Sequence, residues 1–124
     1  MLLTDGPKPV AFDFNGQPHL IQTTIINGKN TLRVIAEMVK LDKKNAADLT
    51  AWDVLATTSD VRYMPLHLEL NCTKNGKPIT REEANAIFET LNVIELEDML
   101  VSASGYRELK NSALAREENQ QAES

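Results

Sequence analysis

The sequence predicts a mainly α-helical α+β fold, with about five helices and a short N-terminal β-hairpin. Three observations indicate this fold class. An Asn-Gly pair stands between two apolar runs near the N-terminus, which is a strong hairpin signal. Apolar residues recur at helical spacing through most of the remaining chain. The length, 124 residues, is ordinary for one domain with its own core.

The composition along the chain suggests three regions. Gly6, Pro7 and Pro9 interrupt the first residues, and the final EENQQAES has almost nothing to bury. We therefore expect a flexible arm over 1–9, a single domain over 10–116 that comprises a hairpin over 10–26 and a helical body over 31–116, and a disordered tail over 117–124.

The hairpin is predicted from AFDFNGQPHLIQTTII, with Asn15-Gly16 as its turn because both residues accept a positive φ. Phe12 and Phe14 alternate with smaller or polar neighbours, so one face of the first strand is aromatic. A hairpin alone is only marginally stable in water. We expect this one to pack against the helices or against another copy of the chain.

Two helices are expected next. The first has Asn30 or Thr31 placed to cap its start, and Leu32, Ile35, Ala36 and Val39 trace a stripe along it at helical spacing. The second begins near Ala46. It carries Trp52, which we expect to anchor the core because of its large area.

The segment from Pro65 to Cys72 fits two structures. Leu66, Leu68 and Leu70 alternate with polar residues, as in a strand. Leu68 and Cys72 also lie on one helical face, and a proline is tolerated in a first helical turn. Periodicity alone leaves both open.

The clearest helix follows Gly76 and Pro78. Thr80 and Glu83 have the spacing of a capping box, in which each side chain bonds to the backbone N–H of the other residue. The residues behind the box place an apolar stripe on one face: Ala84, Ile87, Phe88 and Leu91. Apolar residues at helical spacing also begin at Val93, and Gly105 stands where a helix C-terminal cap is expected.

No pattern of catalytic or metal-binding residues is apparent, so we expect neither an enzyme nor a cofactor. The two histidines, His19 and His67, lack the clustered partners that a metal site needs, and we expect both to be polar residues on exposed faces. Cys72 is expected to be a small buried residue. Glu95, Glu97 and Asp98 are expected to form a solvated helix face.

The charge argues against nucleic acid as a partner. The formal net charge is −5, and no basic stripe interleaved with aromatics is present. There is no apolar run long enough for a membrane helix. A single cysteine fits a reducing compartment, so we expect a cytoplasmic protein.

The order of these elements resembles the tail assembly chaperones of long-tailed bacteriophages. The resemblance rests on VAFDFNGQPHLI, TLRVIAEMV, PITREEANAIFETLN and LEDMLVSASGY, and it covers about Val10 to Tyr106. Members of that family have a short N-terminal β segment before a helical body. On that ground we prefer a helix from Pro65 to Cys72.

The resemblance implies a non-catalytic protein of the host cytoplasm that is absent from the finished virion. Its partners would be the tail tape-measure protein, which it keeps soluble, the tail-tube protein, which it helps to recruit, and further copies of itself. A frameshifted longer form is common in this family. Two alternatives remain: a connector or tail-terminator subunit that forms a ring, and a small regulator that binds nucleic acid.

The residues that we expect to bind such partners come from the hairpin and from the helix that begins at Val93. They are Phe12, Phe14, Met99 and Leu100. Each is large and apolar and can also serve the core, which we favour for Met99 and Leu100 and leave open for Phe12 and Phe14. An apolar face that folding leaves uncovered is a place where another chain can add.

Overall fold

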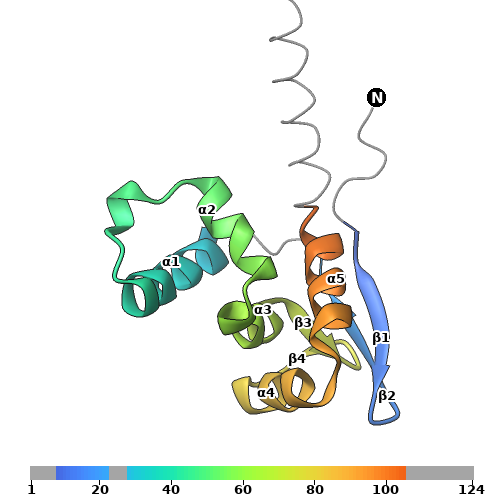
Figure 1. The fold of residues 1–124 in the computed structure, drawn as a ribbon. Coiled ribbons are helices and arrows are strands. Elements are labelled where there is room, and N and C mark those ends of the chain that lie inside the picture. The colour runs from blue at the N-terminus through green and yellow to red at the C-terminus, as the bar shows by residue number, and fades with distance from the viewer. Residues whose placement is uncertain (1–7, 23–27, 106–124) are drawn as a thin grey trace, which may run out of the picture.

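A computed structural model describes residues 8–22 and 28–105 (Figure 1). The predictions for residues 1–7, for the end of the hairpin and for the tail over 117–124 lie outside the described residues. So do residues 106–116 of the expected helical body.

The described residues form five α-helices and a four-stranded antiparallel sheet, which confirms the mainly helical α+β fold. Three short 3-10 turns, η2 (Ala46–Asp48), η3 (Thr57–Ser59) and η4 (Val61–Tyr63), connect the helices. In chain order the strands and helices are β1 (Val10–Phe14), β2 (Gln17–Ile21), α1 (Gly28–Asp42), α2 (Ala51–Ala56), α3 (Met64–Asn71), β3 (Cys72–Lys74), β4 (Lys77–Pro78), α4 (Arg81–Thr90) and α5 (Val93–Ser104).

The sheet consists of two hairpins side by side, in the order β1-β2-β3-β4. The first is the predicted one, and its turn residues Asn15 and Gly16 have φ values of 52° and 76°. The second was not predicted. Asn75 and Gly76 repeat the same turn, with φ values of 52° and 82°, between the very short strands β3 and β4.

Helix α1 differs from its prediction in its start, and its core side is not the predicted stripe. It begins at Gly28, so Asn30 and Thr31 lie inside it. The core side is formed by Val34 and Met38, and Leu32 and Val39 are 68% and 40% exposed. The predicted residues do lie on one face of the helix, but most of that face is exposed, because the helix carries apolar residues on two faces and it is mainly the other one that packs against the protein.

The expected second helix is divided. Residues Ala46–Asp48 form η2, and α2 starts only after Thr50, which makes a capping box with Asp53. Trp52 is 46% exposed, so its prediction as a core anchor is wrong. Val54 takes the buried position of α2 instead.

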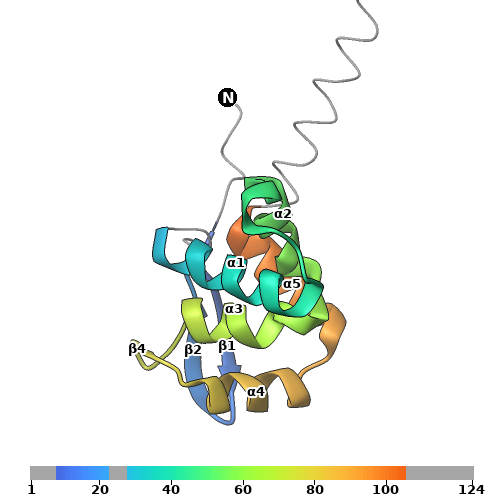
Figure 2. The same ribbon diagram turned by 90° about the vertical axis from the view of Figure 1, so that its left-hand side faces the viewer.

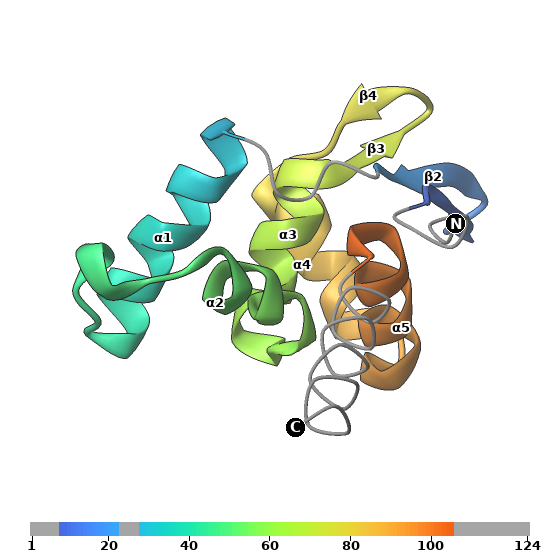
Figure 3. The ribbon, with the colours of Figure 1, turned by 90° about the horizontal axis from the view of Figure 1, so that it is seen from above.

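Helix α3 confirms the helical interpretation of the Pro65 segment. Pro65 occupies its first turn, where the missing N–H costs no hydrogen bond. Leucines two residues apart can both be buried because α3 is enclosed on most sides: Met64, Leu66, His67, Leu68 and Asn71 are all buried. It lies between α1 and α4 (Figure 2) and beside the β3–β4 hairpin (Figure 3).

Two apolar clusters meet on α3. The larger cluster packs the sheet, α3, α4 and α5 together and contains Ile21, Met64, Leu68, Cys72, Ile79, Ala84, Ile87, Leu96, Leu100 and Ala103. The smaller cluster packs α1 and α2 against the other side and contains Val34, Met38, Val54, Tyr63 and Leu66.

Helices α4 and α5 follow their predictions closely. Both reciprocal hydrogen bonds of the Thr80–Glu83 capping box are present, and Ala84 and Ile87 are buried. Helix α5 ends at Gly105, whose φ of 72° places it in the left-handed region that favours glycine.

Candidate partner-binding groove

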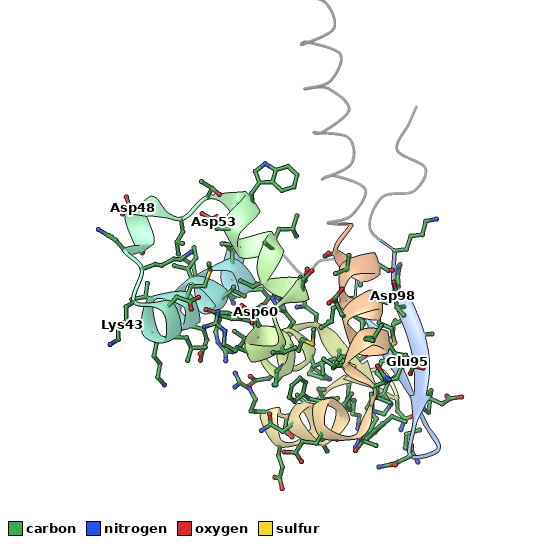
Figure 4. The ribbon with its side chains drawn as sticks, viewed as in Figure 1. Lys43, Asp48, Asp53, Asp60, Glu95 and Asp98 are labelled. Atoms are coloured by element: carbon green, nitrogen blue, oxygen red, sulfur yellow. The ribbon has the colours of Figure 1, made fainter. Side chains whose placement is uncertain are left out.

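A groove runs along the line where β1 faces α5. Its volume is about 360 Å³, and it is lined by Phe12 and Asp13 from β1, Leu91 from the end of α4, and Glu95, Asp98 and Met99 from α5. Figure 4 shows Glu95 and Asp98 on the edge of α5 beside β1. Three segments far apart in sequence therefore build one surface.

The groove has an apolar floor and an acidic rim. Phe12, Leu91 and Met99 are half-buried and pack against the larger cluster. Asp13, Glu95 and Asp98 are exposed around them. None of the lining residues is basic. The surface suits a partner with apolar side chains at its centre and positive charges at its margins.

The four residues predicted to bind partners do not form one patch. Phe12 and Met99 meet in the groove. Phe14 lines a separate cavity of about 170 Å³ beside His19 and Lys74. Leu100 is fully buried in the larger cluster, so its prediction as a surface residue is corrected.

His19 is buried, which corrects the prediction of an exposed residue. Its ring stacks on Phe12, with centroids 5.3 Å apart, and meets the edge of Phe14 at 5.8 Å. Its Nδ1 lies 2.9 Å from the Gln17 carbonyl oxygen and donates to it. The imidazole thus holds both phenylalanines in place on the hairpin.

His67 is also buried, again contrary to the prediction. The Thr57 hydroxyl donates to the Val54 carbonyl at 2.6 Å, so the His67 Nε2–H must donate to Thr57 Oγ1 at 2.7 Å. Its Nδ1 has no hydrogen-bond partner among the described residues. Burial lowers the pKa of His67 to about 4, so the ring is neutral at physiological pH.

Other ionisable groups are tied into the structure. Arg62 donates to Asp42 at 2.6 Å and to Asp60 at 2.8 Å, and the Tyr63 hydroxyl donates to Asp42 at 2.7 Å. The Tyr63 hydrogen bond, followed by that of Arg62, lowers the pKa of Asp42. Burial raises the pKa of the Cys72 thiol to about 11, so it is protonated at neutral pH, as a small buried residue would be.

The described ranges contain no candidate metal site and no candidate membrane span. No group of three or more His, Cys, Asp or Glu there could hold a metal ion. None of the helices described is long and apolar enough to cross a bilayer.

No protein-family model matches this chain, and no curated protein or solved structure is significantly similar to it. The assignment of a role therefore depends on the residues themselves.

The acidic rim is the part of the groove that sequence reasoning missed. Glu95 and Asp98 stand three residues apart on one helix, and we interpreted them as a solvated face. Asp13 lies on β1, and no local sequence pattern predicts that β1 packs beside α5. The only available signal was the separation of Glu95 from Met99 by one helical turn, which places a carboxylate beside a predicted binding residue.

Proposed function

We propose that this protein is a non-catalytic tail assembly chaperone of a long-tailed bacteriophage. It binds the tape-measure protein, keeps it soluble and helps to recruit tail-tube subunits. It acts in the host cytoplasm and is absent from the finished virion. No cofactor takes part, and nucleic acid is not a partner.

The observation that supports this proposal is the presence of apolar surface in two separate places. One is the groove with Phe12 and Met99. The other is on α2, where Trp52 is exposed. A chaperone that coats a long partner needs one surface for the partner and another for the next copy. A half-exposed tryptophan is suited to the partner, because tryptophan is enriched among the residues that dominate binding energy.

The test is co-expression with a candidate tape-measure protein, followed by size exclusion with light scattering. We expect the wild-type chain to keep the tape-measure protein soluble and to elute with it. Trp52→Ala should weaken that complex by at least about tenfold, the loss of a central aromatic contact. Thr90→Ala, at another exposed position, is the control.

Three results would contradict the proposal. One is a tape-measure protein that remains insoluble beside the wild-type chain. A second is a Trp52→Ala variant that has the wild-type melting temperature and binds with unchanged affinity. The third is recovery of the chain in purified virions by mass spectrometry, which would favour a connector or a tail-terminator subunit.

A further inference from the structure

The outward face of α1 carries an apolar stripe that no other described element covers. Leu32, Ala36 and Val39 are exposed and spaced at i, i+4 and i+7, which places them on one face. Leu32, at 68%, is among the most exposed large apolar side chains of the described residues. All three belong to the helical stripe that the sequence predicted.

Positive charge borders the same face. Lys29 precedes Leu32 by three residues and Lys40 follows Ala36 by four, so both lie beside the stripe, and both are exposed. Lys43 follows at the end of the helix. The nearest acid at that end, Asp42, is occupied by hydrogen bonds from Arg62 and Tyr63. The outward face of α1 is therefore apolar with a basic margin.

The groove between β1 and α5 has the opposite character. Phe12, Leu91 and Met99 form its floor, and Asp13, Glu95 and Asp98 form its rim. An apolar helix with basic margins would place its apolar side chains on the floor and its ammonium groups near the carboxylates. This is the charge complementarity expected of a specific contact.

The two surfaces cannot meet within one molecule. Helix α1 lies on one side of α3, and α5 and β1, which line the groove, lie on the other (Figure 3). Figure 4 places Lys43 and Glu95 at opposite sides of the structure. The complementary surface must come from another chain.

We propose that α1 of one copy docks in the β1–α5 groove of a second copy. The contact is heterologous, since it joins two different surfaces and leaves a free α1 at one end and a free groove at the other. Further copies add in the same way and form an open chain or close into a ring. This inference deepens the self-association included in the proposed function, and it rests on that part of it alone.

The contact is small, so the association should depend on concentration. The contact joins three stripe residues to the six that line the groove, and interfaces that bury less than roughly 1,200 Å² are typically weak and transient. Exposed charges contribute much of the complementarity, and salt screens them over about 10 Å at 0.1 M. We therefore expect oligomers to grow with protein concentration and to shrink as salt is added.

The experiment is a charge swap followed by sedimentation velocity over a wide concentration range. One variant reverses the groove (Asp13→Lys with Glu95→Lys), and a second reverses the helix margin (Lys29→Glu with Lys40→Glu). A control with the same change in net charge as the groove variant is Glu82→Lys with Glu89→Lys, both on the exposed face of α4. Circular dichroism verifies that each variant is folded.

We expect each reversed variant alone to associate at least about tenfold more weakly than the wild type. An equimolar mixture of the two should regain association, because the basic groove then meets an acidic helix and the acidic groove meets a basic one. The control should associate like the wild type.

The inference is overturned if the wild-type chain stays monomeric at every concentration, or if the mixture of folded variants behaves like its separate components. It is also overturned if the Glu82/Glu89 control loses association to the same extent, since net charge alone would then account for the effect. No tape-measure protein is present, so this result and the co-expression result can fail independently.

Discussion

The two sides of α3 differ in how completely they are closed. On one side, the sheet, α4 and α5 enclose ten buried residues. On the other, α1 and α2 cover only five. Among the described residues, most of the exposed large apolar side chains belong to this second side: Leu32, Val39, Leu41, Trp52 and Val61. The difference indicates that the larger cluster supplies most of the stability and that the smaller side supplies much of the binding surface.

Truncating one buried side chain in each cluster tests that difference most strongly. Leu68→Ala opens a cavity in the larger cluster and should lower the free energy of unfolding by about 3 to 4 kcal/mol. Met38→Ala, in the smaller cluster, should cost about 2 kcal/mol, because its looser surroundings can collapse around the gap. Urea denaturation measures both, and a greater loss for Met38→Ala would reverse the comparison.

The buried His67 lies on α3, which contributes to both clusters, and it makes the stability of the fold depend on pH. Its pKa is about 4 in the folded chain against 6.5 ordinarily, so the unfolded chain binds the proton first. Stability should therefore fall as the pH is lowered from about 6.5 to about 4, by up to about 3 kcal/mol, and this contribution should level off below that range. His67→Leu should have a flatter profile of unfolding free energy in that window; identical profiles would contradict the assignment.

The two capping boxes offer a smaller, matched comparison. Thr80 caps α4 on the larger side and Thr50 caps α2 on the smaller side, each with a reciprocal partner three residues on. Thr80→Ala should cost about 1 kcal/mol of unfolding free energy. Thr50→Ala should cost about 0.5 kcal/mol, at the lower end for caps, because α2 is short and weakly enclosed. Thermal denaturation would show whether the order is reversed.

The smallest expected effects come from Glu69, which joins the two sides across α3. Arg81 from α4 donates to its carboxylate at 2.7 Å, and Arg33 from α1 lies 3.5 Å away. Arg81→Ala should cost about 0.5 kcal/mol and Arg33→Ala less, since exposed pairs contribute about 0 to 1 kcal/mol. Both losses should shrink in high salt; a loss that does not change with salt would indicate packing instead.

The sequence predicts elements well where a local signal and the tertiary structure agree. Asn15-Gly16, the Thr80–Glu83 box and Gly105 each specify a turn or helix end through their own backbone and side chains. The same Asn-Gly pair at 75–76 does not by itself predict a second hairpin, because strands of three and two residues are too short to display alternation.

Burial was harder to predict than helicity. Helix α1 has apolar residues on two faces, and the period alone cannot choose between Leu32 and Val34. His19 and His67 are buried because a carbonyl at Gln17 and a hydroxyl at Thr57 satisfy one ring nitrogen of each. Such partners are known only once the chain is folded.

The candidate groove was half predictable for the same reason. Phe12 and Met99 are large apolar residues at positions that a sequence can single out as core or surface. The acidic rim depends on β1 and α5 being side by side, which joins Asp13 to Glu95 across most of the chain. No residue spacing in the sequence predicts that contact.

The central position of α3 has a consequence for how the chain opens. Met64 and Leu68 belong to the larger cluster and Leu66 to the smaller, so a single short helix forms a wall of both. Unfolding of α3 would therefore disrupt both clusters at once. The backbone amides of α3 should therefore exchange with solvent only when the whole domain unfolds, whereas those of α1 should exchange through a local opening of lower free energy.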